Sequence, residues 1–449
     1  MSKNLPNILL VHPWIHDFAA YDFWAKPMGL LTLAGILRHH ELNVFYVDCL
    51  DRFHPGSPQK DPHKRYGRGP YMKQRIAKPD IYKDVPRYFS RYGILPEWFK
   101  EELNALPVPD LVLVTSVMTY WYPGAKEAIR MIKEIFPASP VVLGGIYATL
   151  CNRHALDHSG ADQVVSGSAE EKIFEVIETH TSFSTAAKFD KDRLDTYPYP
   201  AFDLQRRLAY VPILTSRGCP FRCPYCASQI LAPKRMTRSP ESVLEEIRFW
   251  NKDFGVEDFV FYDDALLIDA ERQAVPILEN IINNKLRVRF HTPNAVHIRG
   301  ISEETSRLMF EAGFKTLRLG LETVGYDHRE NIDAKVTAEE FRAAAAALKN
   351  AGFKKSQVGA YLLAGLPGQS LGSLEDSIQT VKDCGITPIL AYYSPIPHTE
   401  LWNDAVASSR YDLPADPLYS NNAVFPCQKE GFSWDTIAHL KKLISSSTD

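Results

Sequence analysis

Three cysteines stand close together near the middle of the chain, in a pattern that could bind metal. Cys219, Cys223 and Cys226 form a Cys-x3-Cys-x2-Cys set directly after a predicted strand. Thiolates are strong ligands for zinc and for iron–sulfur clusters, and both kinds of site ordinarily take four protein ligands. No fourth cysteine or histidine lies nearby in the sequence, so three thiolates would leave one metal position open for a substrate or cosubstrate. The alternative is a structural zinc that a distant histidine or cysteine completes.

The cysteine count does not suggest a disulfide framework. The chain has seven cysteines, an odd number, and three of them fall within eight residues. The other four are Cys49, Cys151, Cys384 and Cys427. Cys427 could reach the site as a thiol, but burial as a small apolar side chain is the simpler interpretation. The cysteine pattern therefore favours a metal site over cross-links.

Length and composition describe a folded protein of ordinary character. The 449 residues suggest roughly three domains, or two with a tail, and 45% of the residues are hydrophobic. Lys and Arg number 51 and Asp and Glu 54, so a net charge of −3 argues against nucleic acid as the partner. No apolar run approaches the roughly 18 residues of a membrane span, and no signal peptide is evident, so we expect a cytoplasmic protein.

The first part of the chain, residues 1–185, alternates short apolar runs with amphipathic segments. This alternation is typical of a doubly wound, Rossmann-like α/β domain with a parallel sheet, whose ligands sit at the carboxyl ends of the strands. Strands are predicted at residues 7–11, 43–47, 111–115, 141–143 and 162–165, and helices at 29–37, 123–136 and 169–179. The strand ends that should face a ligand are residues 12–13, 116–120, 144–147 and 166–167.

Residues 52–92 interrupt this alternation. They contain eleven Lys and Arg against three Asp and Glu, six prolines and five tyrosines, so neither a regular helix nor a central strand fits. This basic insertion could cover an anionic ligand with cations and ring faces. The alternative is a surface excursion whose charges are merely solvated.

A second alternation follows a predicted linker at residues 186–205. The domain predicted at 206–400 contains six strand–helix units, which suggests a partial (β/α)6 barrel of the TIM type with its chemistry at the carboxyl ends of the strands. Residues 401–449 form a C-terminal extension with a short helix at 434–444. The six strands are predicted at residues 211–216, 259–262, 288–291, 316–320, 357–363 and 388–393.

The cysteine motif resembles that of the radical S-adenosylmethionine (SAM) enzymes, in particular the group with an N-terminal cobalamin (vitamin B12)-binding-type domain. Cys219, Cys223 and Cys226 match the family's cluster motif, and Tyr225 supplies the aromatic residue before its last cysteine. The resemblance implies a [4Fe-4S] cluster whose open iron is chelated by the amino and carboxylate groups of SAM. It also implies a 5′-deoxyadenosyl radical and an external one-electron reductant of the flavodoxin or ferredoxin type.

The same resemblance suggests which residues bind SAM. Asp263 and Asp264 end the second barrel strand, where the family places groups that take the methionine ammonium, although Asp264 could equally cap the following turn. Glu322 ends the fourth strand and could accept hydrogen bonds from ribose or methionine groups. The adenine is expected near Gly365 and Leu366, in a sequence that could also be an ordinary turn. Asn294, after the third strand, completes the set, with a capping role as its alternative.

The N-terminal domain resembles the family's cobalamin-binding module at residues 26–31, 47–48, 116–119 and 142–145. It lacks the Asp-x-His-x-x-Gly motif that supplies a histidine ligand in cobalamin mutases, and His12 and His16 are better explained as structural histidines. The alternative is a sheet that packs against the barrel and binds no vitamin. The residues expected to meet cobalamin are Met118 and Thr119 below the ring, and Gly144, Gly145 and Gly167 along the nucleotide tail.

The functional hypothesis is methyl transfer to an unactivated carbon or phosphorus centre of a small-molecule or peptide substrate. A second hypothesis keeps the radical but replaces methylation with rearrangement, cyclisation or carbon–carbon bond formation. A third is an iron–sulfur electron-transfer protein without turnover. No residue is singled out as the catalytic acid, base or nucleophile.

Overall fold

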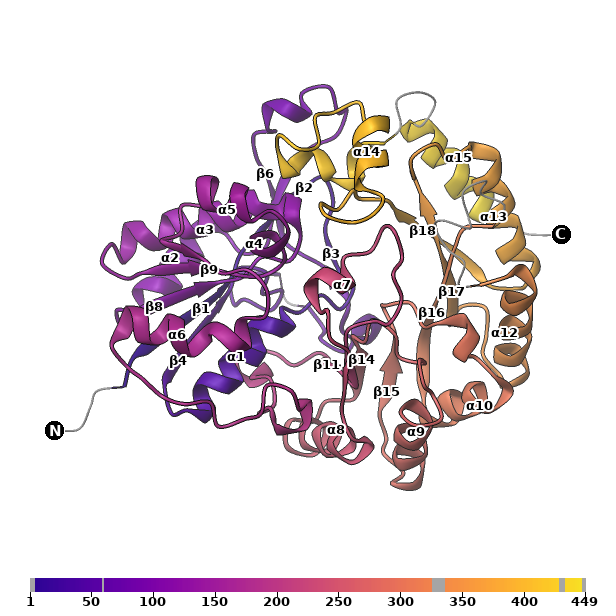
Figure 1. Cartoon of the computed structure of the whole chain (residues 1–449), viewed down its shortest axis with the longest axis horizontal. Coiled ribbons are helices and arrows are strands. Elements are labelled where there is room, and N and C mark those ends of the chain that lie inside the picture. The colour runs from indigo at the N-terminus through magenta and orange to yellow at the C-terminus, as the bar shows by residue number, and fades with distance from the viewer. Residues whose placement is uncertain (1–4, 59, 325–335, 428–432, 446–449) are drawn as a thin grey trace. The chain divides into compact units, whose positions relative to one another are not determined.

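A computed structural model describes residues 5–58, 60–324, 336–427 and 433–445 (Figure 1). The chain forms two compact units, which are considered separately. The first comprises Met1–Ala209 with Asp416–Leu418, and the second comprises Tyr210–Ala415 with Tyr419–Asp449. None of the helices within the described ranges has the length and apolar character needed to cross a membrane.

The first unit contains the predicted five-stranded parallel sheet. Its strands follow the order β10-β9-β8-β1-β4, the flavodoxin-like variant of the doubly wound fold. Since side chains alternate along a strand, Leu9 and Val11 of β1 enter one core, and Ile8 and Leu10 enter the core on the opposite face. Both faces are covered, which is why these strands read as continuous apolar runs. The strands are β1 (Asn7–His12), β4 (Asn43–Asp48), β8 (Leu111–Val114), β9 (Val141–Leu143) and β10 (Gln163–Val164).

Helices cover the two faces of this sheet in pairs (Figure 1). Side chains of α1 (Met28–His39) and α6 (Ala169–Thr181) pack in one core, and those of α2 (Pro96–Asn104) and α3 (Tyr122–Ile135) pack in the other. Two short helices, α4 (Ile146–Leu150) and α5 (Asn152–His158), lie between β9 and β10 in the chain. The predicted doubly wound domain is thus confirmed.

The basic insertion forms small antiparallel sheets with strands of two or three residues. β7 (Ser90–Tyr92) pairs with β6 (Lys73–Arg75) and with β2 (Ile15–Asp17), and β5 (Gly69–Pro70) pairs with β3 (Tyr21–Asp22). The predicted absence of a regular helix or central strand holds for its described residues. The insertion is therefore fastened to the segment that follows β1.

The segment that we predicted as a linker, residues 186–205, lies against α1. The Lys188 N–H donates to His40 Nε2 at 3.0 Å, and the Ala201 N–H donates to the Leu31 carbonyl at 2.9 Å. Ala201 also joins the apolar core on that face. The first unit consequently extends to Ala209.

The second unit contains six parallel strands in the order β11-β14-β15-β16-β17-β18, which confirms the partial barrel. Helix starts follow their capping residues: the hydroxyls of Ser302 and Thr337 accept the backbone N–H three residues on, and both form capping boxes. The strands are β11 (Val211–Ile213), β14 (Asp258–Phe261), β15 (Arg289–His291), β16 (Phe314–Glu322), β17 (Val358–Ala364) and β18 (Thr387–Tyr392). The helices between them are α8 (Pro240–Phe254), α9 (Ala274–Asn283), α10 (Glu303–Ala312), α12 (Ala338–Asn350) and α13 (Leu371–Asp383).

The C-terminal extension contributes α14 (Trp402–Ser408) and α15 (Trp434–Ser445). Leu401 and Ala405 pack with Leu366 and Tyr225 in one apolar cluster, and the Leu401 N–H donates to the Pro224 carbonyl at 2.9 Å. The extension therefore contacts the cysteine loop directly.

Candidate functional site

The three cysteines lie on a loop between β12 (Ser216–Arg217) and α7 (Ser228–Leu231). No disulfide involves them, and each is half-buried. Gly218 turns the chain into the loop with a φ of 83°, and a Cβ there would come within 2.9 Å of the Ala232 and Lys234 carbonyl oxygens. Only glycine fits this turn, which presents the following residues as a compact loop.

Polar side chains brace this loop at both ends. Asp264 accepts hydrogen bonds from the Gly218 N–H and from the Ser228 hydroxyl. Gly218 stands one residue before the first cysteine of the loop, and Ser228 stands two residues after the last. The Gln229 amide donates to the carbonyls of Cys219 and Phe221. Sequence reasoning missed Ser228 and Gln229, because ordinary polar residues at the start of a short helix carry no distinctive signal.

The donor set suits a cluster with an open iron. The Ser228 N–H donates to Cys226 Sγ at 3.4 Å, a contact of the kind that tunes iron–sulfur clusters. Within the described ranges, no three His, Cys, Asp or Glu side chains converge on a position for a single metal ion. In a [4Fe-4S] cluster each thiolate binds its own iron, so its ligands surround the cluster instead of converging on one point. Three unlinked thiols on one braced loop therefore fit a [4Fe-4S] cluster.

Asp263 ties two strand ends together at the base of the site. Its side chain is 2% exposed, and burial raises the pKa of its carboxyl group. One carboxylate oxygen accepts from the Thr215 hydroxyl at 2.6 Å and from the Ser216 N–H at 2.6 Å, and the other accepts from the Thr215 N–H at 3.1 Å. Through these contacts Asp263 positions the cysteine loop, which begins at Gly218, two residues after Ser216. Contact of Asp263 with the methionine ammonium stays a prediction.

Two further predicted residues lie at neighbouring strand ends. The Asn294 amide donates to the Tyr262 carbonyl at 2.8 Å, which joins the segment after β15 to the end of β14. Glu322 ends β16 at an irregularity in the pairing with β17, and its φ of 64° is unusual for a residue other than glycine. Bulges and strained residues of this kind occur next to active sites, where they redirect a side chain.

The turn after β17 is held by a residue that the sequence did not reveal. Gln369 is 6% exposed, and its carbonyl oxygen accepts from the N–H groups of Gly365 at 2.8 Å and Leu366 at 3.3 Å. Its amide nitrogen donates to the Leu363 carbonyl at 2.8 Å. Leu366 in turn packs in the apolar cluster that includes Tyr225. The site residues of the second unit thus share the carboxyl edge of its sheet, and their individual contacts to SAM remain predictions.

In the first unit, Ser116 joins the loops that follow β8 and β9. Its hydroxyl donates to the Gly144 carbonyl at 2.8 Å, and its own carbonyl accepts from the Ile146 N–H at 2.8 Å. Gly145 has a φ of 92°, and a Cβ on it would lie 2.4 Å from the Ser116 carbonyl oxygen. Two loops that were predicted to meet a ligand are therefore packed backbone to backbone.

Replacing Gly145 with alanine is expected to destabilise the first unit by about 2 kcal/mol or more, because the Cβ would strain a left-handed residue and push against Ser116. Gly144→Ala is the matched control, since its Cβ would meet only the Val165 carbonyl, at 4.0 Å. Urea unfolding followed by circular dichroism measures the difference. Equal stability of the two variants would show that the two loops do not depend on this close packing.

Two glycines give open backbone at the ends of β9 and β10. A Cβ on Gly167 would have nothing within 4 Å, and a Cβ on Gly144 would meet only the Val165 carbonyl oxygen, at 4.0 Å. A cavity of about 10 Å³, the size of a single water molecule, lies where the strand order reverses between β1 and β8, the place where doubly wound sheets bind ligands. Met118 lines this cavity, and Thr119 follows it as a buried residue. Open glycine backbone at the ends of β9 and β10 fits the cobalamin tail, and the individual contacts stay predictions.

The two histidines near the end of β1 are held by acidic partners. His12 Nδ1 lies 2.9 Å from Asp48 Oδ1. Burial alone would raise the pKa of the Asp48 carboxyl group, but His12 and the hydrogen bond from the Leu50 N–H lower it, and the net shift is downward. His16 Nε2 lies 3.0 Å from Glu127 Oε2. Both histidines thus have the structural character that the sequence favoured.

Acid stability should depend on Glu127. Burial would raise the pKa of its carboxyl group, but the nearby His16 imidazole and the hydrogen bonds from Arg91 lower it from 4.5 to about 2. A depressed pKa contributes stability above the unfolded value, and this contribution is lost as the pH falls from about 4.5 toward 2. Glu127→Gln is therefore expected to cost about 3 kcal/mol at pH 7 and progressively less below pH 4.5. Urea unfolding as a function of pH measures this, and a cost independent of pH would contradict it.

The partial barrel carries three cysteines on its first loop, and the doubly wound unit carries glycines at its strand ends. This combination suits a metal cluster in one unit and a second cofactor in the other. Residues 213–381 match the sequence model of the Radical SAM superfamily, and residues 96–177 match that of the B12 binding domain. The chain therefore contains a radical SAM domain and a B12-binding domain. These two domains imply a [4Fe-4S] cluster, SAM and cobalamin as cofactors.

Similar proteins include methyltransferases and a cyclase. The chain is 25% identical to an uncharacterized methyltransferase of Pyrococcus horikoshii over 67% of this chain and 70% of that protein. It is 19% identical to the cytidylyl-2-hydroxyethylphosphonate methyltransferase of Streptomyces wedmorensis over 93% of this chain and 85% of that one. It is also 24% identical to the anaerobic magnesium-protoporphyrin IX monomethyl ester cyclase of Cereibacter sphaeroides, over 69% of this chain and 55% of that enzyme.

Solved structures share the fold. The radical SAM methyltransferase TsrM of Kitasatospora setae, with cobalamin and a [4Fe-4S] cluster, superposes with a TM-score of 0.68 at 15% identity, covering 98% of this chain and 91% of that one. The cobalamin-dependent radical SAM enzyme OxsB superposes with a TM-score of 0.60 at 14% identity, covering 90% of this chain and 55% of that one.

Proposed function

We propose that the protein is a cobalamin-dependent radical SAM methyltransferase that methylates an unactivated carbon or phosphorus centre of a small molecule. The observation that carries this proposal is the pairing, in one chain, of a braced three-cysteine loop with a doubly wound unit whose glycine-rich strand ends lie open. The methyltransferase relatives support the same chemistry, since one of them aligns with nearly the whole chain.

When bound, the cofactors would supply a radical that removes hydrogen from substrate and a methyl group that replaces it. In this proposal, the chain's own residues bind and orient. Asp264, Ser228 and Gln229 keep the cysteines in place, and Asp263 keeps the loop at the strand ends. Glu322 would accept hydrogen bonds from SAM, and Tyr225 would keep water from the cluster by packing against Leu366.

Cobalamin binding tests this proposal. The full chain, reconstituted anaerobically with iron and sulfide, is incubated with methylcobalamin and passed over a gel-filtration column. We expect about one corrin per chain by visible absorbance, and Gly145→Ala should retain less because it displaces the loops at residues 116 and 145. Protein that emerges without corrin would contradict methyl transfer by this route.

Cyclisation or another radical reaction without methylation is the second candidate, because the cyclase relative aligns with more than two thirds of this chain. SAM carrying a labelled methyl group separates the two. Label in a product supports the methyltransferase, and turnover that leaves the product unlabelled supports the second candidate.

A further inference from the structure

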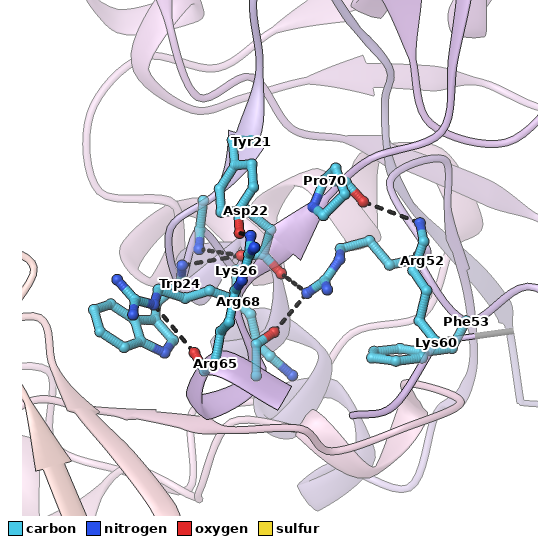
Figure 2. A network of polar contacts seen from close by, with 12 residues as sticks. Tyr21, Asp22, Trp24, Lys26, Arg52, Phe53, Lys60, Arg65, Arg68 and Pro70 are labelled. Carbon is cyan, nitrogen blue, oxygen red and sulfur yellow. Dashed lines mark hydrogen bonds and ion pairs between the residues drawn. The ribbon is translucent and has the colours of Figure 1, made fainter. Parts of the chain in front are cut away.

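We propose that the basic insertion, together with the segment before α1, forms a binding site for a phosphoryl group. Five cations lie in one polar network with Asp22 (Figure 2). They come from segments that are distant in sequence and that β3 and β5 hold together. This site does not depend on the chemistry proposed for the cysteine loop. The five cations are Lys26, Arg52, Lys60, Arg65 and Arg68.

Arg52 is the centre of this phosphoryl site. It is 6% exposed, and its Nη1 donates to Asp22 Oδ2 at 2.8 Å and to the Gly67 carbonyl at 2.5 Å. Its Nε makes no hydrogen bond within the described part of the chain. A Cβ on Gly69 would lie 1.8 Å from its Nη2, so glycine is needed to admit the guanidinium. A buried guanidinium that has an N–H without an acceptor lowers the stability of the folded state unless a bound group accepts that hydrogen bond.

The positive charge of the site exceeds the acidic charge available to it. Lys60 Nζ donates to the Pro70 carbonyl at 3.0 Å, and Arg65 Nη1 donates to the Tyr21 hydroxyl at 3.0 Å, so both cations have neutral hydrogen-bond partners. Burial and the nearby Arg52 lower the pKa of Lys60. Mutual repulsion of this kind is relieved when an anion binds.

The nearby acids are engaged elsewhere. Asp22 pairs with Arg52, and its other oxygen accepts the Trp24 N–H at 3.0 Å. Asp48 is held by His12, and Asp51 pairs with Arg206 at 2.8 Å. Burial lowers the pKa of Lys26 to about 8, although these three acids raise it. The acidic side chains therefore leave a net positive cluster.

Three residues of the phosphoryl site have a left-handed backbone, and the Trp24 ring contacts one of its cations, Arg68. Trp24, Arg65 and Tyr66 have φ values of 69°, 54° and 58°, which is unusual for bulky residues. The guanidinium of Arg68 lies 4.5 Å from the Trp24 ring centroid, and the Trp24 indole donates to the Tyr66 carbonyl at 2.7 Å. Strain of this kind persists where a site is preorganised for binding.

A phosphoryl group is the anion that this arrangement suits best. Its several oxygens can accept hydrogen bonds from an arginine guanidinium and from lysine ammonium groups at the same time. A carboxylate has two oxygens, and one bidentate arginine is enough to bind it. Helix α1 begins at Met28 with no acidic residue in its first turn and no side-chain cap, so its positive end adds to the field. The phosphoryl group could belong to an anionic substrate or to the phosphodiester of the cobalamin tail.

The experiment titrates the full chain, reconstituted with iron and sulfide but without cobalamin, with inorganic pyrophosphate in a calorimeter at low salt. The test variant is Lys60→Gln with Arg65→Gln, and the control is Lys73→Gln, an exposed lysine of the same insertion. We expect the double variant to bind at least about tenfold more weakly than wild type, with the control unchanged. Equal binding by wild type and double variant, or no binding by wild type, would overturn the proposal.

A second titration distinguishes the two sources of the phosphoryl group. Cobalamin and cobinamide, which lacks the nucleotide tail, are bound to wild type and to the double variant. A loss of affinity confined to cobalamin assigns the site to the cofactor tail. Unchanged affinity for both corrins, with weakened pyrophosphate binding, assigns it to an anionic substrate.

Discussion

Replacing Cys219, Cys223 or Cys226 with alanine is expected to abolish loading of the [4Fe-4S] cluster. Each substitution removes one of only three thiolates on the loop, and two thiolates cannot hold four irons against loss to solution. After anaerobic reconstitution, wild type should contain about four irons per chain, with the broad sulfur-to-iron absorbance, and each variant close to none.

Cys384→Ala is the matched control, because Cys384 lies at the end of α13 and outside the loop. It should load iron as wild type does. A variant of the three loop cysteines that retained the full absorbance would show that the ligand assignment is wrong. Loss in the control as well would attribute the effect to misfolding.

Asp263→Ala is expected to have the second largest effect, a loss of folding stability and of iron loading, although Asp263 is not proposed as a ligand of the cluster. The substitution leaves the N–H groups and hydroxyls of Thr215 and Ser216 without their acceptor in a buried position. Each orphaned donor costs about 1–3 kcal/mol, so a loss of about 3 kcal/mol or more is expected. Because Ser216 lies three residues before Cys219, iron loading should fall as well.

Urea unfolding and iron content measure the two effects of Asp263→Ala. Asp253→Asn, an exposed acid on α8, is the control that changes neither. Asp263→Asn should be intermediate, since an amide oxygen still accepts while its nitrogen faces other donors. Wild-type stability and iron content in Asp263→Ala would contradict the positioning role.

The order of strands and helices could be predicted because each core element carries its own apolar periodicity. Both faces of β1 are buried, so its continuous run identified a central parallel strand without knowledge of its neighbours. The same reasoning located the six barrel strands. It extended the first of them to residue 216, whereas the structure ends β11 at Ile213, because Thr215 and Ser216 turn to bind Asp263.

The residues that support the site could not be predicted from local sequence. Gln369, Ser228 and Gln229 act through contacts that depend on how loops fold back, and glutamine and serine are common at helix starts. The pairing of β2 with β7 joins segments more than seventy residues apart, so the small sheets of the insertion left no local pattern. The cysteine loop was predictable because its chemistry needs a fixed residue type at fixed spacing.

Formation of 5′-deoxyadenosine tests the central claim most directly, because it needs no knowledge of the substrate. The full chain is reconstituted anaerobically with iron and sulfide, reduced, given SAM and analysed by mass spectrometry, with Cys223→Ala treated in parallel. We predict that wild type releases 5′-deoxyadenosine and that Cys223→Ala does not. A fully loaded and reduced wild type that releases no more than the variant would contradict the assignment of the cysteine loop to radical SAM chemistry.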